Sequence, residues 1–298
     1  MRAGPVIPPT EGIWAQAVRE VGGVNGAAAP VVRQPGDYHV HTSYSDGSGS
    51  VEECVERAVA LGLREIGIAD HLSGGQPTPW NWASMPVARL DDYVREVREA
   101  AARHRDITVL LGVEADYVAV HEAEITEILS AYPFQYVVGA VHMLDGFVFD
   151  NPATRDDPRW SDPDALFSAN YRAIRAAAEF GHFDIIAHLD YIGLWGHRGG
   201  PGVDREIDAA LRAMAASGCA IELNTDRFSD PAGVMYPLPT TLRRARTLGV
   251  PLVISSDAHA AEHVGRIWDE AIALAREAGY RETLRVSDRA AVPLPDPA

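Results

Sequence analysis

The chain has 298 residues, with 42 acidic side chains against 26 basic ones, and its formal net charge is −16 at pH 7. All 26 basic residues are arginine, so chemistry that needs an amine side chain is excluded, including Schiff-base catalysis and the lysine of a P-loop. Because affinity for nucleic acid comes from clustered basic side chains, the acidic balance argues against nucleic acid as the main partner.

Hydrophobic residues make up 47% of the chain and charged residues 23%, which is typical of a globular protein. No apolar stretch approaches the roughly 18 to 20 residues that a membrane helix needs. Near the N-terminus, Pro5 and Glu11 interrupt the apolar core that a signal peptide requires. Cys54 and Cys219 are predicted to be buried free thiols of a reducing compartment. We therefore expect a cytoplasmic protein without a membrane partner.

Residues 1–36 are rich in glycine, proline and alanine, and we expect them to form an N-terminal arm outside the main fold. From Asp37 onward, short apolar runs alternate with longer segments of helical periodicity. Seven of these runs are predicted strands, namely 37–42, 65–71, 109–117, 136–144, 184–191, 220–226 and 251–259. They are nearly continuously apolar, which is typical of parallel strands covered on both faces.

Helical segments separate the predicted strands. Ser50 to Glu53 has the sequence of a capping box, which predicts a helix start, and a second amphipathic pattern runs from Val203 towards Gly218. Further helices are expected at 91–104, 121–131, 165–181, 239–249 and 265–279. This alternation predicts an α/β fold. A closed barrel is favoured over an open sheet because no glycine-rich dinucleotide loop follows the first strand.

Histidines and carboxylates gather at the ends of the predicted strands. Six of the eleven histidines lie at the ends of five strands, namely His39, His41, His71, His142, His188 and His259. Glu114, Glu222 and Asp257 occupy similar positions. A single such residue is more often an ordinary hydrogen-bonded side chain. In a parallel barrel, however, these strand ends meet at one mouth, and so many desolvated polar groups indicate bound metal.

The kind of metal follows from the donor atoms. Imidazole and carboxylate without thiolate suit Zn²⁺, Mn²⁺ or Fe²⁺. His39 and His41 are separated by one residue on a strand, so they point to the same face and can bind one ion. Because the candidate ligands outnumber those that one ion accepts, we predict a multinuclear centre with two or three divalent ions.

Several motifs occur together in one order. They are HVHTSYSDG (39–47), ADH (69–71), GVE (112–114), GAVH (139–142), AHLD (187–190) and SSDAH (255–259). As a set they resemble the polymerase and histidinol phosphatase (PHP) family of metal-dependent phosphoesterases, over roughly residues 37 to 265. The resemblance implies a distorted (β/α)7 TIM-like barrel with the active site at the C-terminal ends of the strands. Residues 37–298 would then be the catalytic domain.

The resemblance also implies three metal ions held by nine side chains. The first ion would take His39, His41, Glu114 and Asp257, the second His142 and His188, and the third Asp46, His71 and His259. Glu114 would bridge the first two ions. Glu114 and Asp257 would act in catalysis by positioning a metal-bridging hydroxide, the nucleophile that attacks phosphorus. Asp46 lies in Ser-Asp-Gly, which can also be a simple turn.

Within the family, the stretches 114–117, 132–144 and 222–228 look most like the histidinol-phosphate phosphatase branch. Enzymes of that branch hydrolyse L-histidinol phosphate in histidine biosynthesis, so a small phosphorylated substrate is implied. Two alternatives stay open. One is a PHP phosphoesterase that acts on another phosphorylated metabolite or a nucleotide. The other is a nuclease, against which the net charge of −16 counts.

Because lysine is absent, arginine is expected to contact the phosphate of the substrate. Arg227, at a position that matches an arginine of the histidinol branch, is the first candidate. Arg198 and Arg159 are further candidates, for which a solvated surface position is the alternative.

Two further roles have candidates. Asp190 and His197 could donate a proton to the leaving group. Trp80 or Trp82, in the loop after the second strand, could stack on a flat substrate ring, although ordinary loop packing explains them as well.

Overall fold

The structure is a computed structural model that describes residues 36–74, 83–226 and 234–295. The chain divides into two units, residues 1–31 and 32–298, and the first lies outside the described ranges. The second unit holds every element named below. Most of the predicted arm, residues 1–35, is therefore outside the described residues, and Gly36 begins the first strand.

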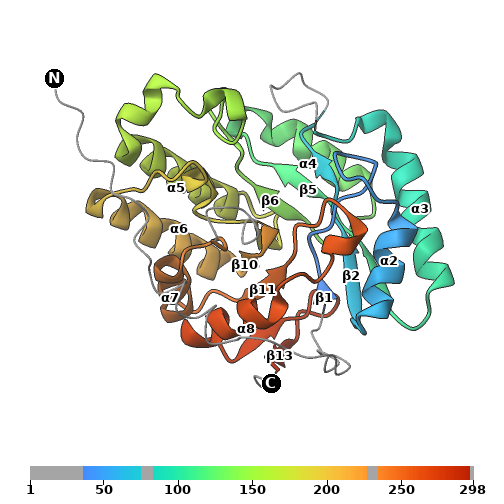
Figure 1. Ribbon diagram of the computed structural model, residues 1–298. Helices are drawn as coiled ribbons and strands as arrows, with labels where there is room; N and C mark the ends of the chain where they lie inside the picture. The colour runs from blue at the N-terminus through green and yellow to red at the C-terminus, as the bar shows by residue number, and fades with distance from the viewer. Residues whose placement is uncertain (1–35, 75–82, 227–233, 296–298) are drawn as a thin grey trace. The chain divides into compact units, whose positions relative to one another are not determined.

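Parallel strands form the centre of the fold (Figure 1). In the first sheet, β1 (Gly36–Asp37) pairs with β2 (Glu65–Ile68), which pairs with β4 (Thr108–Leu111). The second sheet has the order β11-β10-β9-β6-β5-β3. Its strands are β3 (His71–Leu72), β5 (Glu114–Asp116), β6 (Val138–Ala140), β9 (Ile185–Ile186), β10 (Ala220–Asn224) and β11 (Leu252–Ser255).

Backbone hydrogen bonds link the two sheets. The Gly112 amide donates to the carbonyl of Ile68 at 2.9 Å, and the Glu114 amide donates to the carbonyl of Asp70 at 3.1 Å. Where the segments after β1 and β11 meet, Val40 and Ala258 form an isolated parallel bridge. The strands therefore follow one another in the order of a barrel with an interrupted ladder, which agrees with the predicted distorted (β/α)7 architecture.

The strand boundaries differ from the prediction in two ways. The predicted strands 65–71 and 109–117 are each divided in two, into β2 with β3 and β4 with β5. The predicted strand 136–144 ends at Ala140, and β7 (Met143–Leu144) forms an antiparallel hairpin with β8 (Phe147–Val148). The turn residues Asp145 and Gly146 both have positive φ, 47° and 78°, which a tight two-residue hairpin turn requires.

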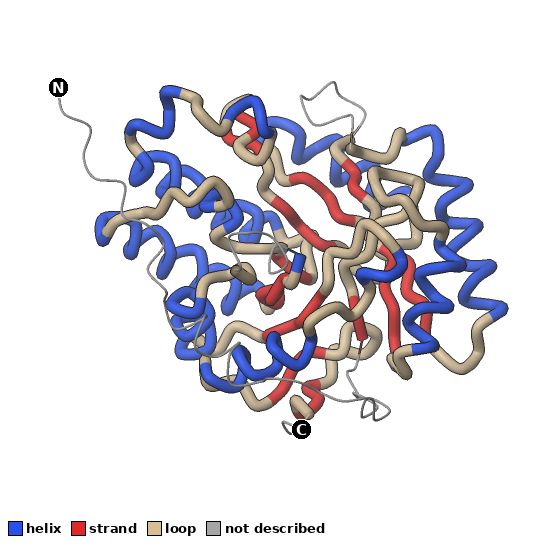
Figure 2. Tube along the Cα trace, viewed as in Figure 1, coloured by secondary structure: helices blue, strands red, loops and turns tan. Residues whose placement is uncertain are grey.

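Helices surround the strands, as the tube view shows in blue (Figure 2). They are α2 (Val51–Ala60), α3 (Leu90–Arg103), α4 (Glu122–Ala131), α5 (Pro163–Phe180), α6 (Asp204–Ser217), α7 (Pro239–Thr247) and α8 (Trp268–Glu277), close to the predicted segments. The capping box of α2 is confirmed, because the Ser50 hydroxyl accepts from the Glu53 amide and the Glu53 carboxylate accepts from the Ser50 amide. None of the described helices has both the length and the apolar character to span a membrane. After α8, β12 (Glu282–Leu284) and β13 (Ala291–Pro293) form an antiparallel pair that the sequence did not predict.

Tyr136 fills space that two glycines leave in the core. A Cβ atom added at Gly67 or Gly112 would overlap the Tyr136 side chain, so both positions require glycine. The Tyr136 hydroxyl donates to the carbonyl of Tyr38 at 2.8 Å. Since Tyr38 directly precedes His39, this buried contact fixes the backbone that carries the first predicted ligands.

Candidate metal centre

The structure brings the nine predicted ligands together at the C-terminal ends of the strands. Donor atoms lie within 4.8 Å of one another in three overlapping groups, namely His41, Asp46, His71 and His259; His39, His41 and Asp257; and His71, Glu114 and His142. The ninth residue, His188, places Nε2 3.3 Å from Oε1 of Glu114. The topology explains this convergence, because parallel strands end at the same mouth.

Glu114 lies in the middle of the cluster. Its Oε2 atom is 3.2 Å from Nε2 of His39 and 2.5 Å from Nδ1 of His71. Its Oε1 atom is 3.3 Å from Nε2 of His188 and 3.8 Å from Nε2 of His142. The side chain has no exposed surface. One buried carboxylate thus lies near imidazoles from four segments of the chain, with both of its oxygens beside ring nitrogens.

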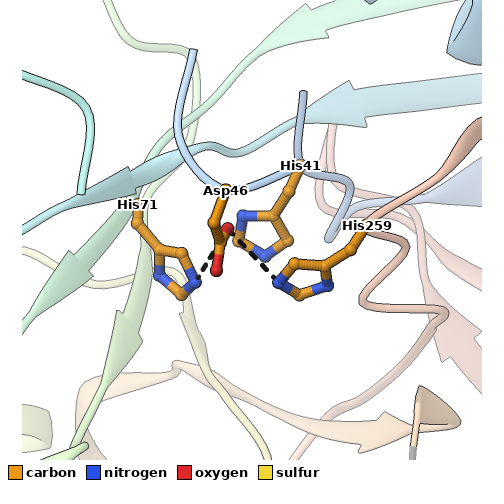
Figure 3. Close-up of side chains that lie close together, drawn as sticks. All are labelled: His41, Asp46, His71 and His259. Carbon is orange, nitrogen blue, oxygen red and sulfur yellow. Dashed lines mark ion pairs between the residues drawn. The ribbon is translucent and has the colours of Figure 1, made fainter. Parts of the chain in front are cut away.

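A second part of the cluster consists of Asp46 and the imidazoles of His41, His71 and His259 (Figure 3). Asp46 lies between two histidines, with Oδ1 3.7 Å from Nε2 of His71 and 3.4 Å from Nε2 of His259. The His41 ring stacks with each of these imidazoles, with 4.3 Å between ring centroids in both pairs. The side chain of His259 is 35% exposed, whereas that of His41 is fully buried. Solvent therefore reaches the cluster at the His259 side.

Carboxylates and a carbonyl orient the imidazole rings. Nδ1 of His39 is 2.8 Å from Oε1 of Glu222, and Nδ1 of His142 is 2.6 Å from Oδ1 of Asp116. Nδ1 of His259 is 3.0 Å from the carbonyl of Asp257. A proton held on Nδ1 leaves Nε2 as the nitrogen available to a metal.

Two of these orienting groups had no predicted role. Glu222 was placed at a strand end without a function, and Asp116 was not singled out. Asp116 follows Glu114 by two residues on β5, so both side chains point to the same face. The two-residue spacing between Glu114 and Asp116 was therefore the sequence signal from which a role for Asp116 could have been predicted.

Asp70 holds the loop that carries Asp46. Its carboxylate accepts hydrogen bonds from the amide and hydroxyl of Thr42, at 2.8 and 2.7 Å, and from the amide and hydroxyl of Ser45, at 3.0 and 2.5 Å. Asp70 itself is fully buried. The loop is therefore anchored one residue before Asp46.

Burial and neighbouring charges move the pKa values of the cluster in opposite directions. Burial, followed by the charges of His71 and His259, lowers the pKa of His41 to about 3. Burial also acts to lower the pKa of His142, but the hydrogen bond and charge of Asp116, together with the charges of Glu114 and Asp150, outweigh burial and raise the pKa to about 10. Burial acts to raise the pKa of Glu114, yet His71 and His39 hold it well below its usual range. The central carboxylate is therefore ionised.

The donor set fits divalent metal ions. The oxygens Asp46 Oδ1 and Glu114 Oε2 are buried beside imidazole nitrogens, yet neither accepts a well-oriented hydrogen bond from any residue that the structure describes. Buried carboxylate oxygens that lack such bonds are costly unless a cation is bound. The mixture of nitrogen and oxygen donors suits a catalytic rather than a structural ion.

Two predicted ligand residues have unusual backbone conformations. His188 has φ 26° and Asp257 has φ 51°, both in the left-handed region that non-glycine residues rarely adopt. Each lies after a strand with one residue between, His188 after β9 and Asp257 after β11. Such strain is typical of functional positions, where the surrounding structure holds a side chain in place.

Two of the three predicted substrate-binding arginines, Arg159 and Arg198, have contacts with other protein groups. The Arg159 guanidinium pairs with Asp157 at 2.8 Å and lies 3.9 Å from the centroid of the Phe147 ring. Arg198 donates to the carbonyls of Gly193 and His197, at 2.9 and 2.7 Å. Arg227 lies outside the described residues, as do Trp80 and Trp82. The roles of the three arginines stay predictions.

The two candidate proton donors also have structural contacts. The Asp190 carboxylate accepts from the Tyr171 hydroxyl at 2.5 Å and from the Leu238 amide at 2.9 Å. The His197 ring stacks on Trp160, with 4.3 Å between ring centroids. Both side chains thus have identifiable packing roles.

A cavity of about 620 Å³ lies at the opposite ends of the strands. Its lining includes Glu65 and Thr108, which begin β2 and β4, and Arg285. The ligands lie at the other ends of the strands, so this cavity is separate from the metal centre.

Comparisons with known proteins agree with the geometry. The model of the PHP domain matches residues 37–226. A probable histidinol-phosphatase of Deinococcus radiodurans is 31% identical over 255 residues, which cover 82% of this chain and 94% of that protein. The histidinol-phosphatase of Lactococcus lactis is 26% identical over 259 residues, which cover 83% of this chain and 92% of that protein.

The fold is also found among solved structures. Histidinol phosphate phosphatase of Lactococcus lactis, in complex with zinc, L-histidinol and phosphate, matches with a TM-score of 0.68 at 24% identity, over 85% of this chain and 98% of that one. This likeness shows the barrel fold. The family match over residues 37–226 shows that the chain belongs to the PHP domain family.

Proposed function

We propose that this protein is a metal-dependent phosphatase that hydrolyses L-histidinol phosphate to L-histidinol and phosphate. The observation that carries the proposal is the buried cluster of imidazole and carboxylate donors around Glu114, at the mouth of the barrel. The substrate is supported by relatives named histidinol-phosphatase, which match 79% to 83% of this chain.

The centre would hold two or three ions of zinc, manganese or iron. Three overlapping groups of donors support more than one ion, and they share His41 and His71. Glu114 contacts imidazoles through both of its oxygens, which supports a bridging role. When bound, such ions supply Lewis acidity that lowers the pKa of water and neutralises the charge of the phosphate.

The protein's own residues would fix the reacting groups. Oδ1 of Asp257 is 3.0 Å from Nε2 of His41, and its Oδ2 accepts from the Asn224 amide at 3.0 Å. Asn224 also donates to Oε2 of Glu222 at 2.9 Å, so one amide orients two carboxylates. Asp257 would therefore be held with one oxygen towards the centre. Arg227, Arg198 and Arg159 remain the proposed phosphate contacts, because guanidinium is the strong cationic side chain available in this chain.

We extend the proposal to the rest of the chain. Residues 37–298 would form the catalytic domain and residues 1–36 an arm outside it. The buried free thiols of Cys54 and Cys219 support a cytoplasmic location. The net charge of −16 supports a small phosphorylated substrate rather than nucleic acid.

The test is phosphate release by protein loaded with Mn²⁺ or Zn²⁺. L-Histidinol phosphate, nucleoside monophosphates and a short oligonucleotide are supplied in parallel. The proposal expects the highest kcat/KM with L-histidinol phosphate. Release from nucleoside monophosphates alone would reject the substrate but keep the phosphatase activity, and activity confined to the oligonucleotide would reject both.

A further inference from the structure

Asp150 is a buried carboxylate near the metal centre that has no role in the assignments above. Its side chain belongs to the described core, with 8% of the residue exposed. Its Oδ1 atom is buried and has no hydrogen-bond partner among the residues that the structure describes. A buried carboxylate oxygen without a partner costs free energy, so its position calls for a ligand.

The β7–β8 hairpin returns the chain to His142 and so determines the position of Asp150. After β8, the Phe149 amide donates to the carbonyl of His142 at 3.3 Å, so the chain returns to the strand end that it left. The Trp195 indole donates to the carbonyl of Phe149 at 2.7 Å. Phe149 is thereby held from both sides, and Asp150 is the next residue. The Asp150 carboxylate interacts electrostatically with His142 and His188.

Asp150 is not needed to orient these histidines. Asp116 already accepts from Nδ1 of His142 at 2.6 Å, and it also accepts a hydrogen bond from the Ser73 hydroxyl. His188 places its Nε2 3.3 Å from Glu114. Asp150 is therefore a second carboxylate near these rings, and its negative charge is not needed to orient the predicted metal ligands.

The Tyr191 ring packs beside the two histidines with which Asp150 interacts. The Tyr191 ring lies 4.8 Å from His188 and 6.2 Å from both His142 and Phe149, between ring centroids. An aromatic surface near a buried carboxylate whose Oδ1 has no hydrogen-bond partner among the described residues suits an organic group that carries a positive charge.

We propose that Asp150 binds the cationic amino group of the substrate's leaving alcohol, so that the site selects phosphate esters of amino alcohols. The inference rests on the proposed function, because L-histidinol carries a protonated amine on the carbon next to its hydroxymethyl group. Asp150 is then a residue that determines specificity, while hydrolysis itself depends on the metal centre.

The experiment compares two substrates that differ by the amine alone. They are L-histidinol phosphate and its deaminated counterpart, 3-(imidazol-4-yl)propyl phosphate. In metal-loaded Asp150→Asn, kcat/KM for the amino ester is expected to fall about ten- to hundredfold, because a charged hydrogen bond is lost, while kcat/KM for the deaminated ester stays within about twofold of wild type. Asp145→Asn is the matched control, since Asp145 is exposed in the same hairpin.

The remaining outcomes separate this inference from the proposed function. An equal loss on both esters, or no loss on either, overturns the role of Asp150 while the proposed activity stands. If wild type cleaves neither imidazole ester, the proposed substrate fails, and 2-aminoethyl phosphate against ethyl phosphate makes the same comparison. Should Asp150→Asn lose its metal content or fold, Asp150→Glu keeps the charge, and a loss confined to the amino ester again supports the inference.

Discussion

Glu222 Oε1 lies 2.8 Å from Nδ1 of His39, and neither side chain is exposed to solvent. The other oxygen of Glu222 accepts from the backbone amide of His188 at 3.0 Å. One buried carboxylate thus orients two predicted ligand residues, which follow two different strands, β1 and β9. We therefore expect the proposed metal centre to depend on this contact, although Glu222 is not among the predicted ligands.

Glu222→Gln is expected to weaken metal binding about 10- to 100-fold, because the amide no longer supplies a charged acceptor for the His39 ring. Competition with a chromogenic chelator measures the affinity. Glu127→Gln is the control, because Glu127 is exposed on α4. Unchanged affinity in Glu222→Gln would show that His39 does not need this acceptor.

Glu114→Gln tests the centre of the cluster. The substitution removes the charge that lies among imidazoles from four segments, so kcat is expected to fall by about 10³-fold in metal-loaded protein. Phosphate release together with metal content per chain is the measurement. Glu56→Gln, on the exposed face of α2, should match wild type. A fully active Glu114→Gln would contradict the assignment of Glu114 as a bridging ligand.

The thiols give a prediction about pH. Burial raises the pKa of the Cys54 thiol to about 12, whereas a thiol in the unfolded chain has a pKa of about 8.5. Below about pH 8.5 both states keep the proton, so this thiol makes no pH-dependent difference to stability. Between about pH 8.5 and 12 the unfolded chain alone releases the proton, so the contribution of Cys54 to stability falls as pH rises.

The same burial predicts low reactivity. At about pH 8, Ellman's reagent should label Cys54 and Cys219 slowly in native protein and rapidly in concentrated urea, because the thiolate is the reactive form. Rapid labelling of the native protein would mean that the thiols are accessible.

Gly112→Ala should destabilise the fold by about 1–3 kcal/mol, because the added methyl group overlaps the Tyr136 side chain. Urea unfolding followed by circular dichroism gives the free energy of unfolding. Gly202→Ala is the control, since its added Cβ would have only an ordinary contact with Asp164, at 3.5 Å. Equal stability of the two variants would rule out tight packing around Tyr136.

The order of the elements was predictable because covered parallel strands are continuously apolar. The residues at which the strands end were less predictable. The runs 65–71 and 109–117 continue with small or apolar residues directly after β2 and β4, Ala69 in one and Gly112 and Val113 in the other, so the interruption depends on the pairing of neighbouring strands. The turn at Asp145 and Gly146 is a hairpin signal, but the apolar run that precedes it concealed the early end of β6.

For the site, histidines at strand ends were sufficient to locate the cluster. Sequence alone could not separate a carboxylate that binds an ion from one that orients a histidine. Glu114 and Asp116 occupy the same face of β5, and only their distances to other strands distinguish them. Asp150 was beyond prediction, because its burial depends on how the hairpin folds back.

The left-handed backbone at His188 and Asp257 sets a limit on engineering. Each such residue destabilises the fold by about 1–3 kcal/mol, and substitution by glycine would remove this destabilisation. Glycine there would remove an imidazole or a carboxylate from the cluster. A search for heat-resistant variants by stability alone would therefore favour inactive proteins at these two positions, and selection for stability must be paired with selection for turnover.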